Sequence, residues 1–91
     1  MPTAEPWKIV YTKDALKDKQ RAYDAGYGNK INKLLETIKA DPFTPYPPFE
    51  KLIGDLAGAY SRRINIQHRL VYMVYPTERT VKVIALPTQY K

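Results

Sequence analysis

The chain has 91 residues, which is enough for one domain spanning residues 1–91 and too few for two. It has no cysteine and one histidine, which excludes disulfides, thiolate nucleophiles and zinc–thiolate sites; no carboxylates cluster, so we expect no metal or other cofactor. Fifteen basic and nine acidic side chains give a net charge of +6, which favours an acidic partner.

The first half of the chain predicts one strand followed by two helices. Residues 7–11 are aromatic and β-branched and indicate a strand. Thr12 can cap a helix over residues 13–25, which are good helix formers. Residues 29–40 indicate a clearer helix, because apolar residues recur at i, i+3, i+4 and i+7. That stripe consists of Ile31, Leu34, Leu35 and Ile38.

The second half predicts a sheet that begins after a stiff loop. Pro42 ends the second helix, and four prolines make residues 42–48 extended. Four segments then read as strands, with a hairpin turn at residues 76–79: residues 49–52, 59–65, 69–75 and 80–86. We therefore predict an α+β domain in which a strand and two helices precede a four-strand antiparallel meander, with both helices on one sheet face.

Basic residues are concentrated in the predicted sheet. Residues 1–48 carry eight basic and six acidic side chains, whereas residues 49–91 carry seven and three. Arginines recur inside the strand-like run from Ser61 to Tyr72, where a sheet has no packing use for them. A guanidinium forks well onto phosphate oxygens. The pattern favours a nucleic-acid backbone held on the sheet, although basic residues that only maintain solubility would give the same net charge.

The spacing of these arginines limits which can share a site. Arg62 and Arg63 are adjacent, so on a regular strand they point to opposite faces and at most one faces a common site. The other is then solvated or packed along its stem. Arg69 begins an apolar strand and is the best candidate phosphate ligand. His68 precedes it and should face away, which favours a structural histidine.

Glu50 is a candidate general base. RNA cleavage can use the 2′-hydroxyl as nucleophile, and the protein must then remove its proton, stabilise the phosphorus centre and protonate the leaving 5′-oxygen. Glu50 is one of three acidic residues after Pro48 and lies at a strand start in the basic half. From its position alone, a surface ion pair with Lys51 or an arginine is the simpler explanation of Glu50. Tyr90 could stack on a base or orient a phosphate.

The stretch from Pro42 to Tyr75, and more loosely the whole chain, resembles the YoeB/Txe branch of the RelE-like toxins. These toxins belong to bacterial toxin–antitoxin pairs and cut messenger RNA on the ribosome. The segments that carry the resemblance are Asp-Pro-Phe at 41–43, Phe-Glu-Lys-Leu at 49–52, Leu-Ala-Gly-Ala-Tyr-Ser-Arg-Arg-Ile at 56–64 and His-Arg-Leu-Val-Tyr at 68–72.

The resemblance assigns roles to residues of this chain. It implies that Glu50 is the general base, that Arg69 binds the scissile phosphate and that Arg63 assists. Relatives end in a His-Tyr pair whose histidine is the general acid, but here the pair is Gln89-Tyr90. A glutamine can donate a hydrogen bond but cannot release a proton at neutral pH.

A second departure concerns the phosphate ligands. Many relatives have a phosphate-binding lysine where this chain has Ile53. Lys51 lies two residues earlier and could replace it. The expected catalytic residues are thus Glu50, Arg69, Gln89 and Tyr90, and the expected phosphate or RNA ligands are Lys51, Arg62, Arg63 and Arg69.

We predict a ribosome-dependent endoribonuclease toxin, attenuated at Gln89. Two alternatives stay open: a non-catalytic module that stalls the ribosome, and a corepressor that works with its antitoxin on operator DNA. The expected partners are an acidic antitoxin, the ribosome and messenger RNA, with operator DNA reached only through the antitoxin complex; a homodimer is also compatible. The start lacks a signal-peptide pattern and no segment has the length of a membrane span, so we expect a cytoplasmic protein.

Overall fold

The computed structural model describes residues 5–87. The predicted order of elements is confirmed, and element ends differ from the expected ones by no more than two residues; a short 3₁₀ helix is added. The elements are β1 (Lys8–Tyr11), α1 (Lys13–Asp24), α2 (Gly28–Ala40), β2 (Phe49–Lys51), η1 (Gly54–Leu56), β3 (Ala59–Arg63), β4 (Arg69–Tyr75) and β5 (Thr80–Ala85).

The strands form one mixed five-stranded sheet in the order β1-β5-β4-β3-β2. The strands from β2 to β5 pair antiparallel with their neighbours along the chain, which is the predicted meander. β1 lies parallel to β5, with Ile9 opposite Val81. This pairing joins the two ends of the described chain, and β2 is left at the opposite edge of the sheet.

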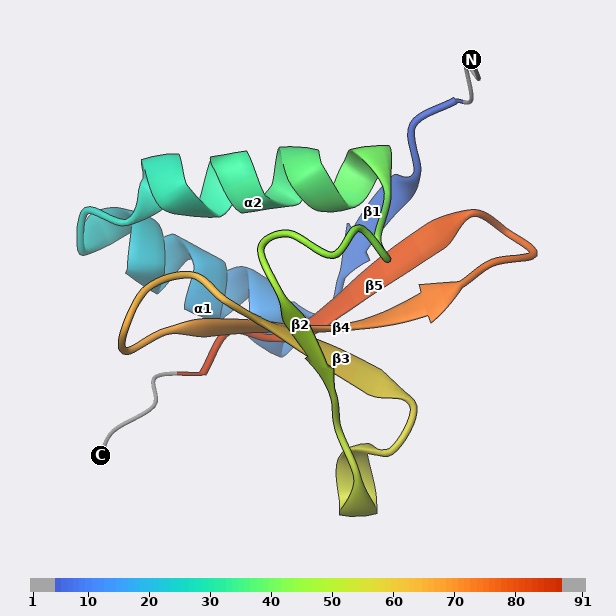
Figure 1. Cartoon of the computed structure of the whole chain (residues 1–91). Helices are drawn as coiled ribbons and strands as arrows, with labels where there is room; N and C mark the ends of the chain where they lie inside the picture. Colours follow the sequence, from blue (N-terminus) through green and yellow to red (C-terminus); the bar gives the residue numbers. More distant parts are fainter. Residues whose placement is uncertain (1–4, 88–91) are drawn as a thin grey trace.

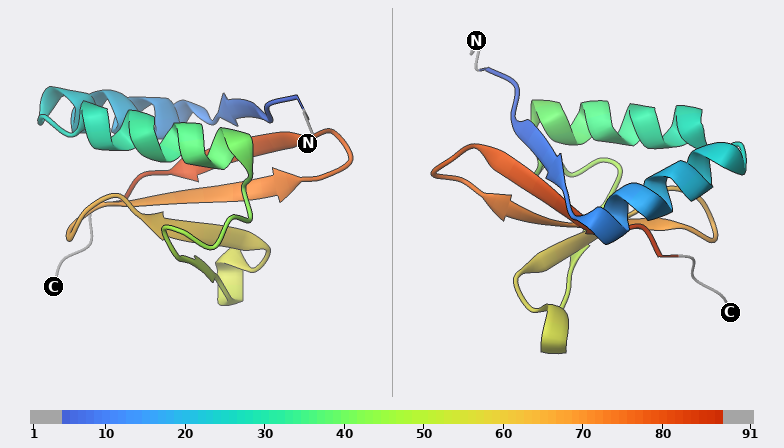
Figure 2. Two further views of the ribbon diagram at one scale, coloured as in Figure 1. Left: turned by 45° about the horizontal axis from the view of Figure 1, so that its top comes forward. Right: turned by 180° about the vertical axis from the view of Figure 1, so that it is seen from behind.

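Both helices cover the same face of the sheet (Figures 1 and 2). The predicted stripe of α2 is buried, and it packs with Tyr72, Val81 and Val83 of the sheet. α1 begins at Thr12, whose hydroxyl accepts a hydrogen bond from the Ala15 backbone N–H at 3.0 Å. Neither helix lies over the other face of the sheet. No helix within residues 5–87 is long and apolar enough to cross a membrane.

An irregularity in β5 sets the position of the last described residues relative to β4. Val71 pairs with Ala85, but the next residue, Tyr72, pairs with Val83, so Ile84 is an extra residue in β5. Beyond this bulge the chain continues along β4, and the Arg69 backbone N–H donates to the Pro87 carbonyl at 3.1 Å. The last described residue therefore lies beside Arg69.

Candidate active site

Strand pairing brings four polar side chains to the sheet face that the helices leave open. Glu50 of β2 lies opposite Ser61 of β3, and Arg63 of β3 lies opposite Arg69 of β4. Residues directly opposite one another share a face, as do residues two apart on one strand. Glu50, Ser61, Arg63 and Arg69 therefore share one face, while Leu70, next to Arg69, points into the core on the other.

Arg69 is the centre of this group. One of its terminal nitrogens, Nη1, donates to Glu50 Oε1 at 3.2 Å and to Ser61 Oγ at 2.8 Å. The Glu50 side chain is 66% exposed, whereas the Arg69 side chain is only 17% exposed. The guanidinium is thus held in place while the carboxylate stays open to solvent. This contact is compatible with Glu50 as a general base and with Glu50 as a member of a surface ion pair, because its partner, Arg69, is itself the candidate phosphate ligand.

A cavity of about 260 Å³ surrounds this contact. It is lined by Pro47, Pro48, Glu50, Ser61, Arg63 and Arg69. An exposed carboxylate can accept a proton, and two neighbouring guanidiniums present fixed donors to an oxyanion. Sequence reasoning missed Ser61, a buried residue that orients Arg69. Its signal was available: on a strand it lies on the same face as Arg63, two residues later.

The structure contradicts the assignment of Arg62 to the phosphate ligands. Its side chain is completely buried on the helix side of the sheet. The guanidinium donates to the Tyr72 hydroxyl at 2.8 Å and to backbone carbonyls of the loop formed by residues 42–48. Of the two adjacent arginines, Arg63 is therefore the one that faces the cavity, and Arg62 is the one packed inside.

Lys51 also lies away from this group. It follows Glu50 on β2, so the strand alternation points it to the other sheet face, and it pairs with Tyr60 of β3. It does not line the cavity around Glu50. The expectation that Lys51 replaces the lysine missing at Ile53 is therefore not met by this geometry.

His68 has the surroundings of a structural histidine. Its ring lies 4.7 Å from that of Tyr27, and its Nδ1 is 3.2 Å from Asn65 Oδ1. Asn65 Oδ1 also accepts the His68 backbone N–H, which stabilises the turn before β4. The two remaining candidates, Gln89 and Tyr90, lie outside the described residues. Within residues 5–87, no group of three His, Asp or Glu side chains could hold a metal ion.

The buried partner of Arg62 leads to a prediction about alkaline pH. Burial raises the pKa of Tyr72 above its usual value of about 10, although the hydrogen bond and charge of Arg62 act the other way. The neutral phenol is therefore favoured in the folded protein. This preference for the neutral Tyr72 phenol adds to the free energy of unfolding. The contribution is complete below about pH 10 and is lost as pH rises through the raised folded-state pKa.

Above about pH 10, the free energy of unfolding should therefore fall more steeply with pH for the parent protein than for Tyr72→Phe, by up to about 1.4 kcal/mol per pH unit. Urea titrations of both proteins between about pH 8 and 11 measure the two slopes. Equal slopes would show that Tyr72 ionises as readily in the folded protein as in the unfolded chain.

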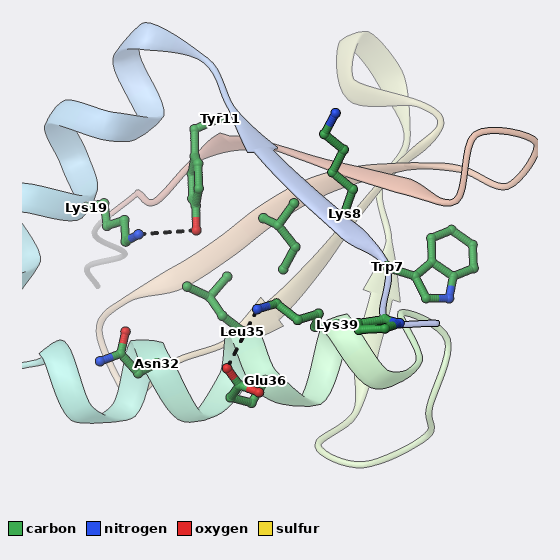
Figure 3. A pocket seen from close by; sticks show the side chains of 10 residues that line it. Trp7, Lys8, Tyr11, Lys19, Asn32, Leu35, Glu36 and Lys39 are labelled. Atoms are coloured by element: carbon green, nitrogen blue, oxygen red, sulfur yellow. Dashed lines mark hydrogen bonds and ion pairs between the residues drawn. The ribbon is translucent and has the colours of Figure 1, made fainter. Parts of the chain in front are cut away.

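A second hollow, of about 510 Å³, lies between β1 and α2 (Figure 3). Lys19 donates there to the Tyr11 hydroxyl at 3.2 Å, and Lys39 pairs with Glu36 at 3.9 Å. Among the described residues that line it there is no arginine, and the single carboxylate, Glu36, is paired with a lysine. The cavity around Glu50 is thus the better match to phosphate chemistry.

Comparison with known proteins shows the family of the chain. The family model for the YoeB-like toxin of bacterial type II toxin–antitoxin systems matches residues 11–90. Toxin YoeB of Streptomyces coelicolor is 41% identical over 61 residues, which are 67% of this chain and 70% of that protein.

Solved structures give the same result. The YoeB/ParE toxin from Agrobacterium tumefaciens is similar with a TM-score of 0.80 and 36% identity, over 91% of this chain and 99% of that one. A chain of the heterotetrameric YoeB–YefM toxin–antitoxin complex from Staphylococcus aureus gives a TM-score of 0.77 and 32% identity, over 92% and 98%. The chain therefore belongs to the YoeB-like toxins of bacterial type II toxin–antitoxin systems.

Proposed function

We propose that the chain is a ribosome-dependent endoribonuclease. It cleaves messenger RNA without a metal ion, and the nucleophile is the 2′-hydroxyl of the RNA itself. The observation that carries the proposal is the contact between Glu50 and Arg69 in a cavity that Arg63 also lines. It unites a proton acceptor with phosphate-binding donors. Membership of the toxin family supports the same conclusion.

Each described residue of the cavity receives a role. Glu50 takes the proton of the 2′-hydroxyl, whose oxygen attacks phosphorus, and a 2′,3′-cyclic phosphate forms as the bond to the 5′-oxygen breaks. Arg69 binds the scissile phosphate and Arg63 assists, so that both stabilise the charge that develops on its oxygens. Ser61 keeps the Arg69 guanidinium oriented through their 2.8 Å hydrogen bond.

The leaving-group step is assigned to residues outside the described part of the chain. Gln89 and Tyr90 follow shortly after Pro87, whose carbonyl accepts the Arg69 backbone N–H. Gln89 donates a hydrogen bond to the departing 5′-oxygen, which takes its proton from solvent water, and Tyr90 shapes the site beside it. An enzyme without a general acid is expected to be slower by about 10²–10⁴-fold.

Mapping of message 5′ ends on programmed ribosomes tests the proposal. The parent protein should produce new ends at the codon in the decoding site, and Glu50→Gln, which keeps the shape but cannot accept the proton, should reduce them by at least about 10²-fold. Arrested ribosomes with intact message would instead favour a non-catalytic module that binds the ribosome and stalls translation. This alternative stays open because the chain has Gln89 where relatives have a histidine.

We further propose an acidic antitoxin as the partner that covers the open sheet face. Residues 49–91 carry seven basic and three acidic side chains, and the Staphylococcus aureus relative is found in complex with an antitoxin. Operator DNA would be bound only through such a complex, and a homodimer is retained as a further assembly. The ribosome and message place the proposed activity in the cytoplasm.

The association rate of toxin and antitoxin should fall as salt rises, because exposed charges are screened over about 8 Å at physiological ionic strength. The dissociation rate should change much less, since apolar contacts set the lifetime of the complex. Stopped-flow mixing with the product of the neighbouring gene measures both. Recovery of the toxin as a free monomer while that product is present would argue against the partnership.

A further inference from the structure

Within residues 5–87, Arg62 is a buried charge whose hydrogen-bond partners are all neutral. Its exposed fraction is 0%. Nε donates to the Tyr72 hydroxyl at 2.8 Å, and Nη2 donates to the carbonyls of Pro42 at 3.0 Å and Thr44 at 2.7 Å. Nη1 donates to the carbonyl of Pro47. Every oxygen in this set is uncharged, so the guanidinium is used for its geometry as a multiple donor rather than for an ion pair.

The three carbonyls span the loop of residues 42–48, which connects α2 to β2. Four of its seven residues are prolines, which have no N–H to donate, so the loop has little capacity to hold itself by backbone hydrogen bonds. The contacts near its start run from the Thr44 and Phe43 N–H groups to Asp41. Arg62 therefore holds the rest of the loop through its hydrogen bonds to the carbonyls of Thr44 and Pro47.

This loop leads directly into the candidate active site. Pro47 and Pro48 line the cavity, and Glu50 follows two residues after Pro48. β2 has only three residues and lies at the sheet edge, so backbone pairing alone holds it weakly. Phe49 provides a second attachment: its ring lies 4.8 Å from the Arg62 guanidinium carbon. Glu50 is thus held by Arg62 through the preceding loop and through its neighbour Phe49.

We infer that Arg62 is a positioning residue that sets the placement of Glu50 relative to Arg69. β3 then serves both sides of the sheet: Arg62 fixes the loop on the helix side, while Ser61 and Arg63 line the cavity on the open side. Arg62 points to one side of this short strand, and Ser61 and Arg63 point to the other. The placement of the proton acceptor and that of the phosphate ligands therefore depend on the same stretch of backbone. The inference extends the proposed function and rests on it for its catalytic consequence.

Arg62→Lys and Arg62→Met test this inference. A lysine keeps the positive charge but lacks the planar fork, so it cannot reach three carbonyls and the tyrosine together. Each variant should lose the Glu50–Arg69 contact in a crystal structure. The kcat for cleavage of ribosome-bound message should fall by about 10²-fold, the effect expected of a misplaced catalytic group, with little change in KM. If Arg62→Met does not fold, Arg62→Lys decides.

Arg79→Lys is the matched control. Arg79 also lies 4.8 Å from an aromatic ring, that of Trp7, and donates to a carbonyl, that of Glu5, at 2.5 Å, but it does not line the cavity. All proteins are assayed well below their Tm. Arg79→Lys should keep the parent kcat even if its Tm falls.

A folded Arg62→Lys protein that retains both the Glu50–Arg69 contact and the parent kcat would overturn the inference. If the parent protein does not cleave message, the proposed function fails, and the crystal structures still decide the role of Arg62. An unchanged loop and an unchanged Glu50–Arg69 contact in Arg62→Lys would then refute it.

Discussion

Replacement of Arg69 by alanine should abolish growth arrest while the protein still folds. Loss of the phosphate ligand removes donors aimed at the charge that develops during cleavage, and removal of such a group typically costs about 10²–10³-fold in rate. The fold should tolerate the change, because Arg69 lies on the open sheet face and is not part of the apolar core. We expect a loss of about 1–2 kcal/mol in the free energy of unfolding.

Growth after induction, compared with thermal melting of the purified protein, measures the two effects separately. Arg79→Ala is the control, since Arg79 lies in the turn between β4 and β5 and does not line the Glu50 cavity. It should remain toxic. A folded Arg69→Ala protein that still arrests growth would refute the role of Arg69 as phosphate ligand.

Replacement of Gln89 by histidine should raise cleavage of ribosome-bound message by about 10²–10⁴-fold, the usual contribution of general acid catalysis. The unperturbed pKa of histidine, about 6.5, allows it to donate a proton near neutral pH. Glutamine at the same position can only donate a hydrogen bond. Mapping of message 5′ ends with the parent and the variant measures the gain.

The double variant Gln89→His with Glu50→Gln is the control for this result. An acid without a base cannot complete the transfer, so the gain should disappear there. An unchanged rate in the single variant would mean that proton donation does not limit the reaction. Detectable cuts by the parent would then assign the proton to Tyr90 or to the ribosome.

Most of the fold could be predicted because its signals are local. The stripe of α2 and the apolar run of β4 are local patterns, and each element is found where it was expected. The position of β1 could not be predicted in the same way. Its pairing with β5 joins residues about seventy positions apart, and the short segment carries no mark of its partner. Only the packing of the whole domain determines it.

The candidate site was predicted in part. Alternation on β3 required that Arg62 and Arg63 separate, but the choice between them depends on the register of β3 against β2 and β4. The burial of Arg62 depends on carbonyls of a loop about twenty residues earlier, which no local pattern reveals. The resemblance to known toxins singled out Glu50 and Arg69, and the geometry supplied their contact and the supporting role of Ser61.

The extra residue in β5 decides which side of the sheet the last described residues face. Up to Val83 alternate residues enter the core, and after Ile84 it is Leu86 that is buried, while Ala85 lies opposite Val71 on the open side. If β5 paired regularly with β4 past Val83, Ile84 would lie opposite Val71 and the two sides would be exchanged for the residues that follow. Leu86 would then turn outward, and the smaller Ala85 would take its place in the core. One unpaired residue thus lets the chain follow β4 as far as Arg69 while Leu86 stays in the core.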